Sequence, residues 1–230
     1  DALKCFHDAV SKYPFEKAAA ESLFLAAECQ YLLARYDLAG EESENFVERF
    51  PVSERTAAAY FLNGEADFYG GNFEGAAASF RRAVSISPDA EWAGLAAYRT
   101  GRSLFETGDY AAAISEYKSC LDRAGGDALK SRALLGLAES YGKSNLTEEA
   151  IAALDEIIRI YPTSGEAPAA YCEKAKILFG AARYKEAERV SRDAIEKFPN
   201  SENLGRLYYG LGLSYAAQGR YEDAIGRFVL

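Results

Sequence analysis

Apolar residues recur along the chain at a fixed interval of 37 residues. One column holds alanine, and the column three residues before it is aromatic in five of six places, with Thr147 as the exception. The alanines are Ala39, Ala76, Ala113, Ala150, Ala187 and Ala224, and the aromatics are Tyr36, Phe73, Tyr110, Tyr184 and Tyr221. A strict period of this length is typical of a solenoid built from stacked copies of one unit. The pattern therefore predicts that function resides on a repeated surface and not in one pocket.

Turn residues punctuate each unit twice. Just before the aromatic column lie Gly71, Gly108, Asn145 and Gly219, which tolerate positive φ and so predict a tight turn. Proline recurs in the same phase at positions 14, 51, 88, 162 and 199, with Gly125 in the vacant place, and proline ends a helix. Each unit is thus predicted to be helix, turn, helix and break. Two residues beyond the break, Ser53, Asp127, Ser164 and Ser201 are predicted N-caps.

The 37-residue period continues along the whole chain, which predicts one array of repeats without linkers. We expect the second helix of a partial repeat at 1–14, full repeats at about 15–51, 52–88, 89–125, 126–162 and 163–199, and a truncated repeat at 200–230. Both ends then fall within a repeat. On this interpretation the chain, 1–230, is a piece of a longer protein.

The second full unit carries a known signature. Its columns are filled by Tyr60, Gly64, Ala76, Phe80, Ala83 and Pro88. This pattern resembles the tetratricopeptide repeat (TPR) superfamily, whose usual unit is 34 residues. The resemblance implies an all-α fold, a right-handed α-solenoid of stacked antiparallel helix pairs. The longer 37-residue unit is similar to repeats of bacterial envelope proteins, such as the outer-membrane β-barrel assembly lipoprotein and the Tol-Pal accessory protein.

Composition narrows the partner class. The net charge is −9, and phosphate binding needs a basic face, so no nucleic-acid partner is expected. No apolar run reaches the roughly 20 residues that span a bilayer, so no membrane insertion is expected. Four cysteines without metal-ligand spacing and a single histidine, His7, leave no metal site, no cofactor and no catalytic constellation, so an enzyme is not expected.

The resemblance favours the bacterial periplasm or envelope, whereas the unpaired cysteines favour the cytoplasm.

The resemblance also implies that the first helices line a concave groove. The positions facing it in the fifth and sixth units are Cys172, Glu173, Lys176, Phe179, Arg206, Tyr209 and Leu213. The first two units place three acidic residues there, Glu21, Glu28 and Glu65. The later units place six basic residues against three acidic ones, which predicts a charge gradient that orients an extended peptide.

Candidate partner-binding residues follow from these positions. They are Trp92, Tyr98, Arg102, Phe105, Phe61, Glu65, Phe68, Arg132, Glu139, Lys176 and Tyr209. Aromatic and arginine side chains dominate interface hot spots. For Trp92, the only tryptophan, packing against the preceding helix is the alternative to a role as ligand anchor.

The sequence therefore predicts a non-enzymatic scaffold that binds a protein or an extended peptide in its concave groove, in bacterial envelope assembly. One alternative is end-to-end self-association through Phe228, Val229 and Leu230. Another is a substrate-recruiting arm of an enzyme whose catalytic domain lies outside this chain.

Overall fold

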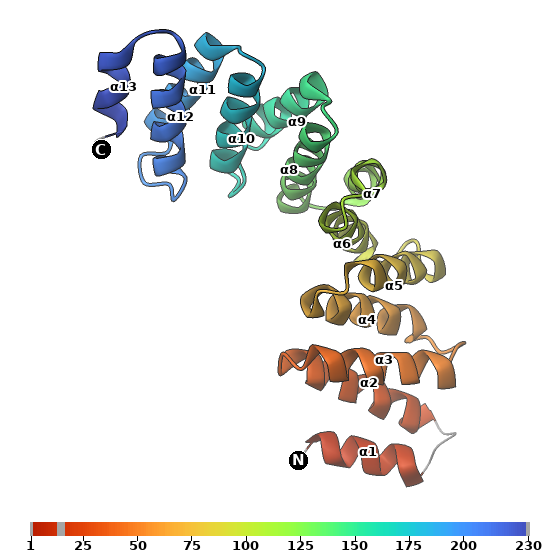
Figure 1. The fold of residues 1–230 in the computed structure, drawn as a ribbon. Helices are drawn as coiled ribbons and strands as arrows, with labels where there is room; N and C mark the ends of the chain where they lie inside the picture. The colour runs from red at the N-terminus through yellow and green to blue at the C-terminus, as the bar shows by residue number, and fades with distance from the viewer. Residues whose placement is uncertain (1, 13–16, 229–230) are drawn as a thin grey trace. The chain divides into compact units, whose positions relative to one another are not determined.

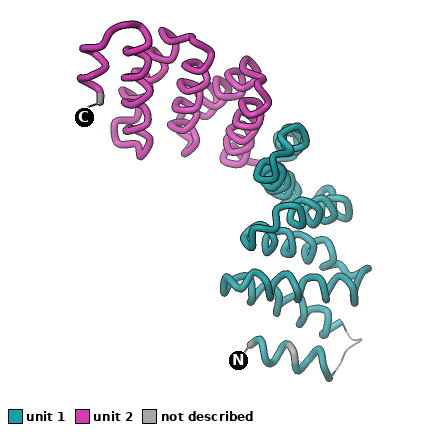
Figure 2. The backbone as a smooth tube through the Cα atoms, viewed as in Figure 1, with its two compact units in different colours: residues 1–125 teal, residues 126–230 magenta. Residues whose placement is uncertain are grey.

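The computed structural model describes residues 2–12 and 17–228, with the side chains of Ala2, His7 and Phe228 excepted (Figure 1). The expectations for Pro14, for the His7 side chain and for the apolar segment Phe228 to Leu230 fall outside what is described. Two compact units divide at Gly125 and Gly126, where glycine replaces the proline of the other breaks (Figure 2).

Helices account for the regular structure of the described residues. Unit 1 holds α1 (Ala2–Lys12), α2 (Lys17–Leu32), α3 (Tyr36–Arg49), α4 (Thr56–Gly70), α5 (Phe73–Ile86), α6 (Ala93–Glu106) and α7 (Tyr110–Arg123). Unit 2 holds α8 (Asp127–Lys143), α9 (Thr147–Ile160), α10 (Ala167–Gly180), α11 (Tyr184–Lys197), α12 (Leu204–Ala217) and α13 (Tyr221–Phe228). Within each unit every helix packs on the helix before and after it. The predicted all-α array of consecutive helix pairs is confirmed.

Within a pair, a small residue of the first helix faces a large residue of the second. A methyl group added at Gly64 of α4 would lie 2.8 Å from the ring of Phe80 on α5. At Gly101 of α6 it would lie 3.0 Å from the ring of Tyr117 on α7. Phe80 and Tyr117 are fully buried. The small column of the first helix thus lets the two backbones approach closely enough to enclose an aromatic ring.

The tight turn between paired helices has left-handed backbone geometry. Gly71, Gly108, Asn145 and Gly219 have φ of 86°, 85°, 58° and 75°, which confirms the prediction. Ala34 and Ala182 occupy the same column, with φ of 55° and 58°. Alanine gives no sequence signal for this geometry, because a side chain disfavours positive φ.

The predicted N-caps were wrong. The N-cap residues of α4, α10 and α12 are Arg55, Glu166 and Asn203, two residues beyond the serines, and α8 begins at Asp127 itself. The serines start an extra turn instead. The carbonyl of Ser53 accepts from the Thr56 amide at 3.0 Å, and its hydroxyl accepts from the Arg55 amide at 3.2 Å. The hydroxyl therefore satisfies a turn amide before the helix begins.

Candidate functional site

Helices α2, α3 and α4 of unit 1 carry an aromatic cluster, which we define as Tyr31, Tyr36, Phe68 and Tyr69. The rings of Tyr36 and Tyr69 stack with centroids 5.3 Å apart, and Tyr31 lies 5.8 Å from Tyr36 and 6.1 Å from Tyr69. Phe68 meets Tyr69 edge to face at 5.6 Å. Tyr69 is the most exposed of the four, at 46 %. The cluster joins α2, α3 and α4 and presents one aromatic edge to solvent.

A buried ion pair anchors this cluster. Glu65 on α4 is only 6 % exposed, and its Oε1 lies 2.7 Å from Nε of Arg99 on α6. The hydroxyl of Tyr31 donates to Oε2 of Glu65 at 3.0 Å, and Nη2 of Arg99 donates to the same oxygen at 3.3 Å. The Arg99 guanidinium also covers the rings of Phe68 and Tyr69, 5.2 and 5.5 Å from their centroids. Each charge is therefore matched within the protein.

The electrostatics agree with this pairing. Burial and the carboxylate of Glu65 raise the pKa of Tyr31 above its usual value, so the phenol remains a hydrogen-bond donor. Burial opposes the charge on Arg99, but Glu65 and Tyr69 outweigh it and raise the pKa of the guanidinium. Glu65, predicted as a groove charge, thus serves as the internal partner of Arg99.

The other candidates of unit 1 pack mainly against the protein itself. Half-buried Trp92 packs against the buried cluster around Phe80 of the preceding helix, α5, and lies 5.2 Å from Phe61 of α4, which supports the packing alternative for the tryptophan. Tyr98 lies 5.9 Å from Tyr117, between the helices of the third pair. Trp92 and Tyr98 therefore contribute as much to the core as to a surface.

Arg102 and Phe105 are closer to the surface of α6. Nη2 of Arg102 lies 2.7 Å from Oε1 of Glu106, and its guanidinium covers the Phe105 ring at 5.4 Å. Phe105 also meets Tyr110 edge to face across the turn, at 5.3 Å. These side chains form a half-exposed strip on α6.

In unit 2, the first helices enclose a cavity of about 200 Å³, which we call the α10–α12 pocket. It is lined by Cys172, Ala175, Lys176 and Phe179 of α10, Ser191 of α11, and Arg206, Leu207, Tyr209, Gly210 and Leu213 of α12. Six of these ten are among the seven groove positions predicted for the fifth and sixth units, with Glu173 as the one outside. The repeat phase therefore brought together residues from two successive first helices.

Two further candidates lie on α8. Nε of Arg132 is 3.3 Å from Oε1 of Glu166, and the hydroxyl of Ser131 donates to Oε2 of Glu166 at 2.7 Å. Glu139 is half-buried, two turns along the same helix. Neither Arg132 nor Glu139 lines the α10–α12 pocket. The eleven candidates therefore divide among three places: α4 to α6, α8, and the pocket.

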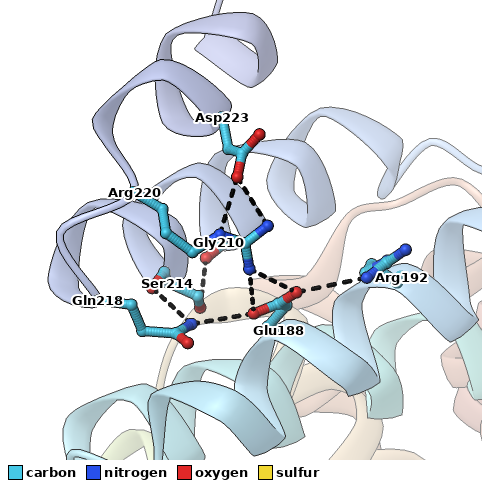
Figure 3. Close-up of polar contacts among 7 residues, drawn as sticks. All are labelled: Glu188, Arg192, Gly210, Ser214, Gln218, Arg220 and Asp223. Carbon is cyan, nitrogen blue, oxygen red and sulfur yellow. Dashed lines mark hydrogen bonds and ion pairs between the residues drawn. The ribbon is translucent and has the colours of Figure 1, made fainter.

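The second helices of unit 2 carry a polar network of their own (Figure 3). Glu188 of α11 accepts from Nη1 of Arg220 at 3.1 Å and from Nε2 of Gln218 at 3.0 Å, and it pairs with Arg192 at 3.4 Å. Arg220 also pairs with Asp223 at 2.7 Å. Figure 3 shows Arg220 and Gln218 converging on Glu188 from the turn before α13. The network ties α11 to the α12–α13 junction.

This network predicts acid sensitivity. Burial raises the pKa of Glu188, but the hydrogen bonds from Gln218 and Arg220 outweigh it and lower the pKa below its usual value. The resulting stabilisation is complete above the unfolded pKa, near 4.3, and is lost as pH falls through the lowered folded value. We expect Glu188→Gln to cost about 1 kcal/mol at pH 7 and to flatten the loss of stability between pH 5 and 3. Urea unfolding at each pH measures both, with exposed Glu196→Gln on the same helix as control; equal pH slopes in the two variants would contradict it.

Two features of these sites were not predicted from the sequence: the floor of the pocket, at Ser191 and Gly210, and the pairing of Glu65 with Arg99. A signal for the pairing exists. Tyr31 and Glu65, Glu65 and Arg99, and Arg132 and Glu166 are each 34 residues apart, one helical turn short of the 37-residue period. Side chains on successive first helices therefore meet at the period minus three, which a scan for opposite charges would detect.

The described residues also bear on two other classes of site. None of their helices is both long and apolar enough to cross a bilayer. The same residues contain no group of three or more His, Cys, Asp or Glu side chains placed to hold a metal ion.

Solved structures share this fold. The C-terminal part of a TPR repeat-containing protein from Cytophaga hutchinsonii is 15% identical, with a TM-score of 0.74 over 99% of this chain and 88% of that one. A tetratricopeptide repeat protein from Parabacteroides merdae is 18% identical, with a TM-score of 0.72 over 91% of this chain and 77% of that one. MamA from Desulfovibrio magneticus is 15% identical, with a TM-score of 0.64 over 77% and 93%. At these identities the likeness concerns the fold alone.

Sequence comparison identifies the family. No curated protein sequence matches the chain. The sequence profile of the Tetratricopeptide repeat matches residues 93–165 and 172–229, together more than half of the chain. Together with the 37-residue period and the helix pairs, this match shows that the chain belongs to the tetratricopeptide repeat family, whose members are protein-interaction scaffolds.

Proposed function

We propose that this chain is a non-enzymatic scaffold whose first helices bind an extended segment of a partner protein. The observation that supports it is the α10–α12 pocket, because six of its lining residues are positions that the repeat phase assigned to a ligand-facing surface. Exposed aromatic and basic side chains, Tyr209 at 60 % and Lys176 at 71 %, stand at its rim. Such side chains are typical of interface hot spots.

The candidates contribute unequally to this function. Lys176 and Tyr209, at the rim of the pocket, carry contacts to the partner, and Arg102 and Phe105 carry contacts on the first-helix surface of unit 1. Trp92, Tyr98, Phe61, Phe68 and Glu65 shape that surface from below, since each packs or pairs internally. Arg132 and Glu139 add polar contacts on α8. Partner binding is therefore best tested at the exposed rim, where substitution leaves the core intact.

Photo-crosslinking tests the assignment. Placing p-benzoylphenylalanine at Tyr209 should yield covalent adducts with a defined partner protein in cells. Tyr221 is the matched control, because it is an aromatic residue of similar exposure, 67 %, on the second helix α13. Adducts of equal yield from Tyr221, or from neither position, would contradict binding by the first helices.

We further propose that the scaffold works in the bacterial envelope. The support is the 37-residue unit with an aromatic residue before the proline, as in Phe50-Pro51 and Phe198-Pro199, which resembles repeats of envelope proteins. Cys5 is exposed and offers a reporter thiol. A maleimide that cannot cross the inner membrane should label Cys5 in intact cells of the native organism. Labelling only after lysis would place the protein in the cytoplasm.

A further inference from the structure

The fifth repeat lacks the large core residue that the four repeats before it have. Two positions of each second helix, three residues apart, are fully buried, and in four repeats at least one of them is large. The pairs are Ser43 and Phe46, Phe80 and Ala83, Tyr117 and Cys120, and Leu154 and Ile157. In the fifth repeat both are small, Ser191 and Ala194, and both are fully buried. A side chain of aromatic or leucine size is therefore missing from this layer of the core.

The missing volume coincides with the α10–α12 pocket. Ser191 lies at the floor of this cavity of about 200 Å³. Gly210 of α12 keeps it open, since a methyl group there would lie 3.9 Å from the Ser191 hydroxyl. Sites for small molecules usually measure about 300–1,000 Å³. The pocket is thus of a size for one side chain and smaller than most cofactor sites.

The floor of the pocket presents an unsatisfied polar atom. The hydroxyl of Ser191 is fully buried and has no hydrogen-bond partner. The buried hydroxyls of Ser103, Ser140 and Ser214, on first helices, each donate to the carbonyl four residues earlier, at 2.8–2.9 Å. The hydroxyl of Ser43, which holds the position of Ser191 in the first repeat, is also unpaired, but Ser43 does not line a pocket of this kind. Leaving a buried hydroxyl unpaired is costly, so a ligand that supplies a partner gains affinity. An incoming hydroxyl at the tip of an apolar group would meet that need.

The rim favours a negatively charged ligand. Lys176 and Arg206 stand at the rim, and the nearest acidic side chain, Glu173, lies 2.8 Å from Lys176. Nη1 of Arg206 donates to the amide oxygen of Asn203 at 3.3 Å, and among the described residues the guanidinium has no carboxylate partner. The rim therefore carries one more positive than negative charge, which favours acidic neighbours around an inserted side chain.

We propose that the α10–α12 pocket is a receptor for a tyrosine side chain of an acidic segment in the partner protein. The ring replaces the core residue that the fifth repeat lacks, its hydroxyl pairs with Ser191, and flanking carboxylates meet Lys176 and Arg206. This rests on the proposed scaffold function and names the chemistry of the segment that the scaffold recognises.

Short capped peptides test this with the full chain. Acetyl-Glu-Glu-Tyr-Glu-Glu-amide should shift the amide resonances of Ser191 and Gly210 in NMR titrations. Its phenylalanine counterpart should bind about fivefold more weakly, because the Ser191 hydroxyl remains unpaired. Peptides with alanine at the centre, or with lysine in place of glutamate, should leave these resonances unshifted. Equal shifts from the glutamate and lysine peptides, or no shift from the tyrosine peptide, would overturn the proposal.

Two variants separate loss of binding from loss of folding. Ser191→Leu fills the cavity as Leu154 fills the fourth repeat, so the melting temperature should stay the same or rise while peptide affinity falls at least tenfold. Ser191→Ala should bind but no longer prefer tyrosine over phenylalanine. Gly205→Leu is the control, because Gly205 lies on α12, which also lines the pocket, with nothing within 4 Å of an added methyl group, and it should bind like the unchanged chain.

The partner assay distinguishes this proposal from the broader one. If adducts at Tyr209 persist in the Ser191→Leu variant, the scaffold function stands and the tyrosine receptor is wrong. If Tyr209 gives no adducts even in the unchanged chain, the scaffold assignment itself fails. Loss of adducts in Ser191→Leu alone, with Gly205→Leu unaffected, is the result we expect.

Discussion

Replacing Arg99 with alanine should lower the free energy of unfolding by about 3 kcal/mol. The substitution leaves the carboxylate of Glu65, which is only 6 % exposed, without its cation. It also uncovers the faces of Phe68 and Tyr69. Partial exposure of the Arg99 side chain, at 22 %, keeps the expected cost at the lower end of the range for a broken buried pair. Urea unfolding followed by circular dichroism measures the change.

Arg102→Ala is the matched control for this prediction. Arg102 lies on the same helix, one turn away, and its ion pair with Glu106 is more exposed on both sides. We expect it to cost less than about 0.5 kcal/mol. Adding Glu65→Gln to Arg99→Ala should recover about half of the loss, because a neutral amide is cheaper to bury than a carboxylate. Equal costs for the two arginines would show that the Glu65 pair is no more important than a surface pair.

The ion pair of Glu65 and Arg99 is a feature of the site that was not predicted from the sequence. The phase correctly placed Glu65 and the pocket residues on first helices, and it brought Cys172, Lys176 and Tyr209 together. Each groove position was predicted to be open to a ligand, but a side chain of the neighbouring repeat can already occupy such a position. Glu65 and Arg99 are 34 residues apart, so adjacent first helices satisfy each other's charges before any partner arrives.

Local geometry limited the fold prediction in a similar way. The period and the turn glycines are strong signals, because positive φ selects glycine and asparagine. Ala34 and Ala182 adopt the same turn without that signal, since the flanking helices fix the backbone there. Ser53 and Ser201 matched an N-cap by residue type, but their hydroxyls accept hydrogen bonds from backbone amides of the turn that precedes the helix. Residue type alone cannot separate these two uses of serine.

The sequence predicted that function resides on a repeated surface and not in one pocket. The α10–α12 pocket is an exception, and it arises because a small residue, Ser191, stands where other repeats have a large core side chain. The helix phase assigns Ser191 to the same core column as Phe80, Tyr117 and Leu154. Comparing side-chain sizes down that column and its neighbour three residues later would have located the cavity. The chemistry at its floor could not be read this way, because whether a serine hydroxyl bonds back to its own helix depends on the backbone contacts of the folded chain.

Phe80→Ser should reproduce that loss of volume in the second repeat and cost about 4 kcal/mol of unfolding free energy. Phe80 is fully buried, and its ring fills the space that Gly64 leaves between α4 and α5. Serine there removes the ring and adds a buried hydroxyl, giving the Ser-Ala pair found in the fifth repeat.

The first repeat supplies the compensating change for that substitution. Its pair, Ser43 and Phe46, carries the aromatic ring three residues later, and Phe46 is fully buried. The double variant Phe80→Ser with Ala83→Phe adopts this arrangement and should regain at least about 1 kcal/mol over Phe80→Ser alone, because restored volume removes part of the cavity cost. Thermal and urea unfolding of the two variants beside the unchanged chain measure the recovery. If Ala83→Phe instead lowers stability further, the two positions do not exchange volume, and the deficit at Ser191 would need another cause.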